Sequence, residues 1–210
     1  MAAKQGTFIT LEGGEGAGKS TQLDRIRAWL EARGHRVRVT RQPGGTPVSE
    51  KIRGLLLDER GHQISDLAEL LLLFADRAQF MAEVVRPALA AGETVLCDRF
   101  TDSTYAYQGG GRGVPAEWIA DLAALVHGDH DPDLTLLFDV PVETGFARIG
   151  GRGEADRMER EDRAFHERVR RRYLELAAAA PGRFEVIDAR PGPEAVWRAV
   201  EEALVARIER

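Results

Sequence analysis

The chain has 210 residues, of which 43% are hydrophobic and 30% are charged, and a net charge of −5. This composition is typical of one globular domain with its own core, excludes general disorder, and argues against a general nucleic-acid binder. Only Lys4, Lys19 and Lys51 among its 29 basic residues are lysines; the arginine excess fits either genomic base composition or a site that needs forked donors for phosphate.

One cysteine, Cys97, excludes an internal disulfide framework and a cysteine-based zinc cluster. The first six residues contain no apolar signal segment, and the longest apolar stretch, residues 67–75, is too short to span a bilayer. These features predict a cytoplasmic protein that contacts no membrane.

Short apolar segments alternate with longer segments of helical periodicity. Because the strand segments are continuously apolar, they predict a parallel sheet covered on both faces, an α/β doubly wound fold with five strands flanked by helices. With no linker or repeat, residues 1–210 are predicted to form one domain, in which the glycine-dense segments 43–47 and 150–153 are mobile. The predicted strands are 7–12, 36–40, 94–98, 134–140 and 184–188, and the predicted helices are 19–32, 66–89, 118–126, 141–148, 160–179 and 194–208.

The first strand and helix enclose a phosphate-binding pattern, G-x-x-x-x-G-K-[ST], at residues 13–20. Its glycines let backbone N–H groups surround a phosphate chain, and the helix N-terminus adds further donors. Lys19 is expected to reach the β- and γ-phosphates, and the Ser20 hydroxyl to bind Mg²⁺. The predicted nucleotide-binding residues are Gly13, Gly14, Glu15, Gly16, Ala17, Gly18, Lys19, Ser20 and Thr21.

This loop occurs in GTPases, motor ATPases and small-molecule kinases alike, so it does not define the reaction. A GTPase would be expected to carry the base-reading pattern Asn-Lys-x-Asp, which is absent from the sequence. Nothing in the sequence supports a switch or a motor.

A second polar segment begins where the predicted strand 94–98 ends. Asp98 is expected to lie beside the phosphate loop and to hold Mg²⁺ through water, although an aspartate at a strand end also caps turns. Arg99 is expected to point into the crevice at the carboxyl ends of the strands, where it can bind an acceptor phosphate. Residues 100–113 are rich in hydroxyl, amide and aromatic groups that suit a base and a sugar.

Phe74 and Arg77 share one face of the predicted helix 66–89 because they are three residues apart. A ring beside a forked donor can stack on a base and bind its carbonyl. The pair also fits a core phenylalanine beside an arginine that extends to the surface, and taken alone it favours this second interpretation.

Together these segments resemble the thymidylate kinases. The resemblance implies a P-loop kinase fold and transfer of a phosphoryl group from ATP to dTMP with Mg²⁺, giving dTDP for dTTP biosynthesis. It also implies a homodimer packed through long helices, to which residues 66–89 would contribute. The segments that carry it are Thr40-Arg41-Gln42-Pro43-Gly44-Gly45-Thr46, Phe74-x-x-Arg77, Asp98-Arg99-Phe100, Ser103-Thr104, Ala106-Tyr107-Gln108-Gly109 and Arg152-Gly153-Glu154-Ala155-Asp156-Arg157.

The resemblance assigns the members of a dTMP site. Phe74 is expected to stack on thymine, and Tyr107 to lie under the deoxyribose and disfavour a 2′-hydroxyl. The other members are Arg77, Thr104 and Gln108 for the polar edge of the base, Arg53 and Arg99 for the phosphate, Glu15 for the 3′-hydroxyl and the phosphate, and Ser103.

Arg152 lies in a predicted mobile lid at about residues 149–158, from which it can act as an arginine finger. Some thymidylate kinases carry this arginine in the phosphate loop, where the present chain has Gly16. The chain therefore resembles the lid-arginine type, which is the usual bacterial one.

Two positions depart from that type. Gln42 replaces an acid that is usual in the pattern Arg-Glu-Pro-Gly-Gly, and Gly150 stands where relatives often carry another lid arginine. The second departure concentrates the predicted lid function on Arg152, with Arg148 as its backup.

The predicted catalytic residues are Lys19, Arg99, Arg152 and Glu15, and the predicted reaction is in-line attack of a dTMP phosphate oxygen on the γ-phosphorus. Positioning and charge neutralisation are expected to supply most of the rate. Two rival functions remain. One is another nucleoside or nucleotide kinase of the same fold, such as a deoxynucleoside kinase, for which the arginine-rich acceptor side is unfavourable. The other is a P-loop binding or regulatory protein that hydrolyses slowly.

Overall fold

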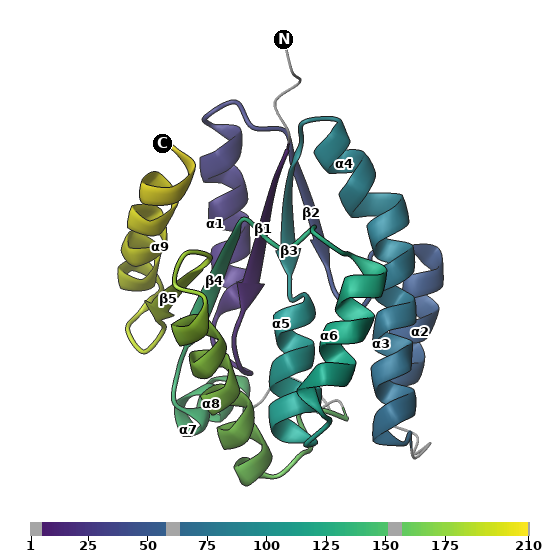
Figure 1. Ribbon diagram of the computed structural model, residues 1–210. Helices are drawn as coiled ribbons and strands as arrows, with labels where there is room; N and C mark the ends of the chain where they lie inside the picture. The colour runs from purple at the N-terminus through teal and green to yellow at the C-terminus, as the bar shows by residue number, and fades with distance from the viewer. Residues whose placement is uncertain (1–5, 58–63, 151–156, 210) are drawn as a thin grey trace.

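The computed structural model describes residues 6–57, 64–150 and 157–209. Within them, five strands form one all-parallel sheet in the order β2-β3-β1-β4-β5 (Figure 1). The predicted α/β class is confirmed, and no predicted strand end is wrong by more than one residue. The strands are β1 (Thr7–Glu12), β2 (Val37–Arg41), β3 (Thr94–Asp98), β4 (Leu134–Asp139) and β5 (Phe184–Asp188).

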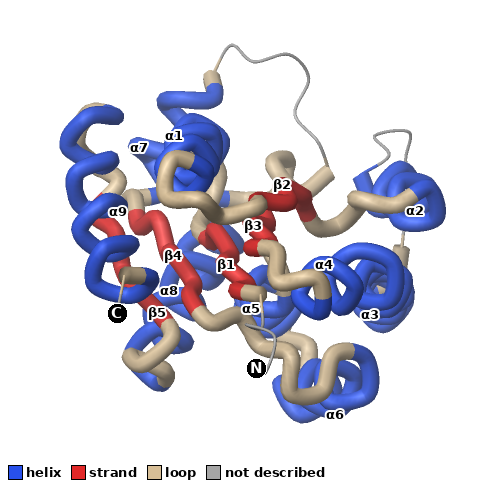
Figure 2. Tube along the Cα trace, turned by 90° about the horizontal axis from the view of Figure 1, so that it is seen from above, coloured by secondary structure: helices blue, strands red, loops and turns tan. Residues whose placement is uncertain are grey.

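Helices cover both faces of the sheet, as the continuously apolar strands require. Figure 2 shows α1 (Lys19–Glu31) and α9 (Pro193–Ile208) on one face and α3 (Asp66–Phe80) on the other. Along β4, Leu136 and Phe138 pack in the cluster that contains residues of α1 and α9. Leu137 between them points to the opposite face and packs against α8. Three further helices are α6 (Ala116–Val126), α7 (Val142–Ile149) and α8 (Arg163–Ala179).

The predicted helix 66–89 is three consecutive helical elements. Ser65 caps α3 by accepting a hydrogen bond from the Ala68 amide, and α3 runs into a π-helical turn, η1 (Met81–Val85). The short α4 (Arg86–Ala90) follows and contains Pro87, which has no N–H to donate to the preceding turn. The widened turn directly before this proline accommodates the missing hydrogen bond.

Two helical segments escape the sequence prediction. The first is α2 (Pro47–Leu57). The second consists of α5 (Thr101–Thr104) and the π-helix η2 (Tyr105–Gly111) that follows it. Residues 43–47, which the sequence predicts to be mobile, form two hydrogen bonds with neighbouring helices: Gly44 N donates to Asp76 Oδ1 (3.0 Å) and Gly45 N to Glu50 Oε1 (2.9 Å). These bonds connect the turn before α2 to α3 and to α2 itself.

Strand register brings the two sequence motifs together. Leu11 of β1 lies opposite Asp98 of β3, so the segments that follow the two strands leave the sheet at the same edge. None of the helices in the described ranges has the length and hydropathy that crossing a membrane requires.

Candidate active site

The phosphate loop packs closely on its surroundings. Gly16 has a left-handed φ of +66°, and a Cβ at this position would lie 2.0 Å from the carbonyl oxygen of Gly145 in α7. The close approach explains why the loop carries glycine here: the backbone of α7 already occupies the space of a side chain.

Lys19 begins α1 and is buried beneath the loop. Its Nζ donates to the carbonyl oxygens of Gly13 (3.0 Å) and Gly14 (3.1 Å). Burial lowers the pKa of Lys19, the charge of Arg99 lowers it further, and the charge of Glu15 opposes both. The ammonium group is therefore held at the loop, where a phosphate chain would be cradled.

Glu15 of the same loop is joined to the acceptor side. It accepts hydrogen bonds from Arg99 Nη2 and from the Tyr107 hydroxyl, both at 2.7 Å. Burial alone would raise the pKa of Glu15, but the positive charges of Arg99 and Lys19 outweigh it and lower the pKa to about 2. Glu15 is thus an anion that holds Arg99 and Tyr107 at the loop.

Arg99 has a left-handed backbone, with φ at +70°, an uncommon conformation for a residue other than glycine. Its Nη1 donates to Gly13 O (3.0 Å), and the guanidinium carbon lies 5.0 Å from the centre of the Tyr107 ring. The strained backbone directs the arginine across the mouth of the loop rather than along the strand.

Asp98 and Ser20 line the same cavity as Lys19. Asp98 Oδ1 is buried and has no hydrogen-bond partner within the described part of the chain, so one carboxylate oxygen is available for a ligand. In the described ranges no group of three or more His, Cys, Asp or Glu side chains could hold a metal ion by itself. This donor set fits Mg²⁺, which is usually bound by one or two protein oxygens together with water and phosphate.

Arg77 also lines the cavity and is almost fully buried. Its Nη2 donates to Thr104 Oγ1 (3.0 Å), and its guanidinium group lies near the rings of Phe74 (4.8 Å) and Phe100 (5.2 Å). Burial lowers the pKa of Arg77 to about 10, so the side chain stays charged at neutral pH. Nε and Nη1 have no partner among the described residues, which leaves two donors for a ligand.

Phe74, whose predicted stacking on thymine stays a prediction, lies in the core beside Arg77. It does not line the cavity but packs in a core cluster with Leu70, Ile119 and Ala123, only 2% exposed. Leu73, the preceding residue, lines the cavity instead. The packing of α6 against α3 takes Phe74 into the core, and one step along a helix turns a neighbour by about 100°.

Gln108, Arg53 and Ser103 line the cavity, and their predicted contacts with dTMP stay predictions. Gln108 Nε2 donates to Glu69 Oε1 (2.7 Å), and Arg53 Nη1 donates to Pro43 O (2.8 Å). Ser103 donates to Glu12 Oε2 (2.6 Å), a buried carboxylate behind the site. Each of these side chains is thus oriented by a second contact.

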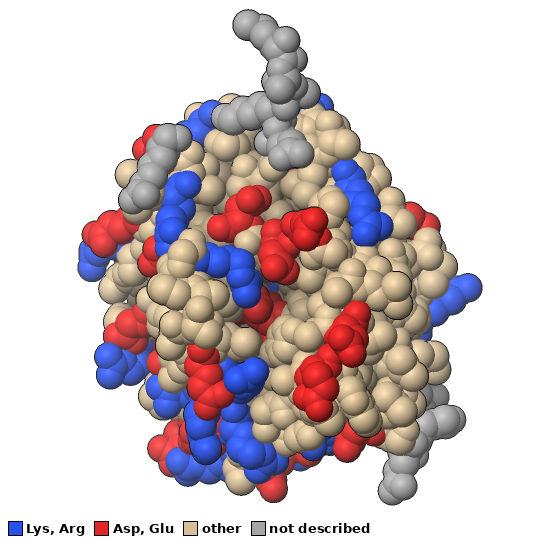
Figure 3. All heavy atoms as spheres, viewed as in Figure 1, with Lys and Arg blue, Asp and Glu red and all other residues tan. Residues whose placement is uncertain are grey.

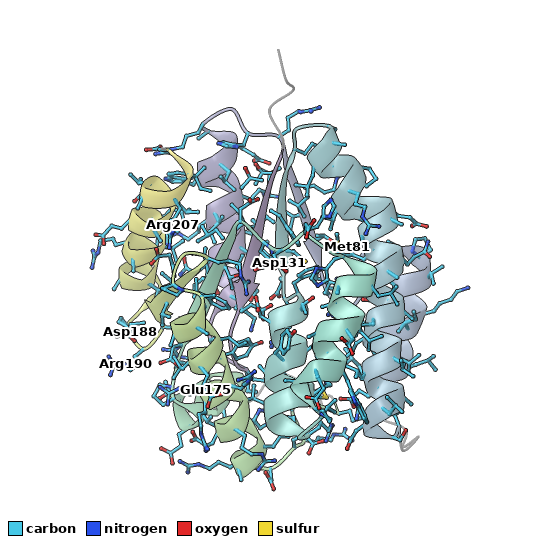
Figure 4. All side chains as sticks on the ribbon, in the orientation of Figure 1. Met81, Asp131, Glu175, Asp188, Arg190 and Arg207 are labelled. Atoms are coloured by element: carbon cyan, nitrogen blue, oxygen red, sulfur yellow. The ribbon has the colours of Figure 1, made fainter. Side chains whose placement is uncertain are left out.

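Arg148 connects the loop to the far end of the chain. It donates to the carbonyl oxygens of Gly16 (3.4 Å), Ala189 (2.8 Å) and Arg190 (2.9 Å). The Arg190 side chain pairs with Asp188 at the surface (Figure 4). These bonds hold Arg148 at the cavity wall, and its role as the backup of Arg152 stays a prediction.

One cavity of about 1100 Å³ contains these groups. It extends from the phosphate loop to Gln108 on one side and to Pro191 on the other. Its size suits two ligands of nucleotide size rather than one. All predicted site residues that the structure describes line it, with the exceptions of Gly13, Gly14 and Phe74. Arg152 lies outside the described residues, and its predicted role remains a prediction.

Glu69 and Arg157 also line this cavity, and neither of them is assigned a role in the site from the sequence. Glu69 is buried and accepts from Gln108, Arg112 and Arg157. An acid in the first turn of an amphipathic helix is usually interpreted as a helix-dipole partner, so its sequence position carried no signal.

The sequence is similar to known thymidylate kinases along most of its length. The family model described as thymidylate kinase matches residues 11–200. The thymidylate kinase of Pseudomonas putida is 55% identical over 205 residues, 98% of each chain, and that of Pseudomonas syringae pv. syringae is 59% identical over 184 residues, 88% of each. The crystal structure of thymidylate kinase from Ehrlichia chaffeensis superposes with a TM-score of 0.77 at 34% identity, covering 95% of this chain and 99% of that one.

Proposed function

The chain belongs to the thymidylate kinase family and phosphorylates dTMP to dTDP in dTTP synthesis, and on that premise we propose that ATP is the phosphoryl donor and Mg²⁺ the cofactor. The P-loop supports this assignment, since its glycines, Lys19 and Ser20 are the groups that hold a triphosphate and its metal.

The observation that carries the acceptor assignment is the pair of buried, unpartnered donor nitrogens on Arg77, which lines the same cavity as the P-loop. Among the described residues these two N–H groups find no acceptor, and a buried guanidinium in that state is costly unless a ligand accepts from it. A carbonyl oxygen of thymine supplies that acceptor. Thr104 and Gln108, on the same wall, would contact the rest of the polar edge.

The other acceptor contacts are proposed from the side chains that line the cavity between the base site and the triphosphate site. Tyr107 and Glu15, which share a hydrogen bond at the cavity wall, would face the deoxyribose, with the Glu15 carboxylate accepting from its 3′-hydroxyl. Arg99 and Arg53 would hold the phosphate of dTMP, for which a guanidinium can form two parallel hydrogen bonds.

Transfer then needs positioning rather than a protein base. The phosphate of dTMP is ionised near pH 7, so its oxygen can attack the γ-phosphorus in line with the leaving group. Lys19 and Arg99 would hold the two phosphates against each other and neutralise their charge. Ser20 and Asp98 would hold Mg²⁺, which withdraws negative charge from the triphosphate when bound.

We also propose that the 210 residues form one kinase domain and that it acts in the cytoplasm. The cluster in which Ile26 of α1 packs with Val200 of α9 supports a single core, because it unites both ends of the chain. The nucleotide substrates and the buried free thiol of Cys97 fit a reducing, nucleotide-rich compartment.

A homodimer through α3 and α6 completes the proposal. Leu67 and Leu71 of α3 and Trp118 and Leu125 of α6 are large apolar side chains exposed at the surface, and Figure 3 shows uncharged atoms around the acidic side chains over α6. Exposed apolar patches of this kind mark protein interfaces. Light scattering should give twice the mass of one chain, and Leu71→Asp should give the single-chain mass; a single-chain mass for the unmodified protein contradicts the dimer.

The acceptor assignment is tested with ATP, Mg²⁺ and a panel of dTMP, dUMP, UMP, AMP and thymidine, scored for the phosphorylated product. We expect dTMP to be the best acceptor and thymidine to be inert, because only a monophosphate engages Arg99 and Arg53. Phosphorylation of thymidine at a rate comparable with that of dTMP would overturn the assignment.

A further inference from the structure

Glu69 is a buried carboxylate at the base end of the cavity. It lies in the first turn of α3 with 1% of its side chain exposed, yet it lines the cavity. Because a buried carboxylate is costly without partners, its contacts indicate what it does. Its Oε1 accepts from Gln108 Nε2 (2.7 Å) and Arg112 Nε (3.4 Å), and its Oε2 pairs with Arg157 Nη2.

Two guanidinium groups neutralise this carboxylate and are themselves held from elsewhere. Arg157 Nε donates to Leu56 O (2.9 Å) at the end of α2, and Arg112 Nη1 pairs with Glu161 (2.6 Å). Glu69 is therefore a fixed anion, and an anion can only accept hydrogen bonds.

The fixed anion determines which way the amide of Gln108 faces. Only the NH₂ group of Gln108 can pair with a carboxylate, so the carbonyl oxygen must point to the other side. That oxygen has no hydrogen-bond partner within the described ranges and is not among the fully buried unpartnered atoms, and Gln108 lines the cavity. The amide therefore presents an acceptor, rather than a donor, to a bound base.

We propose that Glu69 is a positioning residue which, by fixing the amide of Gln108, selects a pyrimidine that carries an N–H at its ring edge. Thymine and uracil carry this N–H at N3, whereas cytosine has a lone pair there that the Gln108 oxygen repels. The inference rests on the proposed placement of the acceptor base beside Gln108, and it names the residue that gives that contact its direction.

The test compares Glu69→Gln with the unmodified enzyme, using dTMP and dCMP as acceptors. The amide introduced by this substitution can either donate or accept, so the amide of Gln108 is free to turn over. We expect kcat/KM for dTMP relative to dCMP to fall about tenfold, mainly through a higher KM for dTMP, because one buried hydrogen bond loses its direction. Glu83→Gln, an exposed position in η1, is the matched control and should leave the ratio unchanged.

Two further variants distinguish the role of Glu69 from the proposed placement of the base beside Gln108. Glu69→Asp retains the charge that Arg112 and Arg157 need but withdraws the carboxylate from Gln108, so it should also lower the ratio of kcat/KM for dTMP to that for dCMP. It provides the test if Glu69→Gln does not fold. Gln108→Met removes the amide altogether. Once Gln108 is replaced by methionine, adding Glu69→Gln should change the ratio no further.

The outcomes divide as follows. If the Glu69 variants slow both acceptors equally, or leave the ratio unchanged while Gln108→Met lowers it, the inference about Glu69 is wrong and the base site stands. If Gln108→Met also leaves the ratio unchanged, the base does not contact Gln108, and the proposed acceptor site itself fails.

Discussion

Glu12 and Glu15 lie three residues apart at the start of the phosphate-binding segment, but their surroundings move their pKa values in opposite directions. Burial raises the pKa of Glu12 to about 7, and the nearby charge of Asp102 adds to the rise. Hydrogen bonds from Phe100 N (2.7 Å), Ser103 (2.6 Å) and Tyr173 (2.8 Å) only partly offset it. Glu12 thus holds the turn that carries Arg99, while the ionised carboxylate of Glu15 lines the cavity.

The raised pKa of Glu12 predicts a pH-dependent stability. The folded chain binds this proton more tightly than the unfolded chain, whose carboxyl has the ordinary pKa of 4.5. The contribution of Glu12 to stability is therefore full below pH 4.5 and is lost as the pH rises through about 7. In urea unfolding, the stability of the unmodified protein minus that of Glu12→Gln should be larger at pH 5 than at pH 8 by about 2 kcal/mol. A difference that is constant or grows with pH would show that the carboxyl is ionised throughout.

Leu73 lines the cavity whereas Phe74 packs in the core, and this difference can be tested by mutating each residue. Leu73→Ala removes apolar contact with the base and should raise KM for dTMP about tenfold with little loss of stability. Phe74→Leu should leave KM nearly unchanged and destabilise the fold by about 1–2 kcal/mol, because it leaves space in a packed core. Steady-state kinetics and thermal unfolding of both variants check this pair. The opposite pattern would restore Phe74 as the base-stacking residue.

At the scale of elements, the regular strands and the long helix follow from the sequence because their apolar periodicity is local. The turn and helix at 43–57 and the α5–η2 segment do not, because their glycine, proline, serine and threonine residues favour turns. Their conformation depends on distant partners: Asp76 fastens Gly44, and Glu12 fastens Ser103. The same two segments supply Arg53 and Gln108 to the cavity.

The contact between the phosphate loop and α7 is tested by Gly16→Ala. The new Cβ would lie 2.0 Å from Gly145 O on a backbone with positive φ, so the loop or α7 must move. We expect the melting temperature without nucleotide to fall by several degrees, which corresponds to about 1–3 kcal/mol. Gly14→Ala is the control, since a Cβ there has no neighbour within 4 Å. Equal melting temperatures for the two variants would refute the close packing.

At the scale of the whole molecule, a negative net charge coexists with a basic cavity. The net charge is −5, yet arginines line the cavity at both ends, including Arg77, Arg99 and Arg148. The P-loop could be found from the sequence because its residues are contiguous. Glu69 could not be connected with Arg157, since 88 residues separate them and only the fold brings them together.

The most direct test of the proposed dTMP site is to measure KM for dTMP and KM for ATP with the variant Arg77→Met. Methionine keeps the apolar contacts with Phe74 and Phe100 but removes the buried donors. We expect KM for dTMP to rise at least about tenfold while KM for ATP changes by less than about twofold, because Arg77 bonds to Phe100 and Thr104 rather than to the phosphate loop. A rise in KM for ATP with an unchanged KM for dTMP would contradict the placement of the thymine base at Arg77.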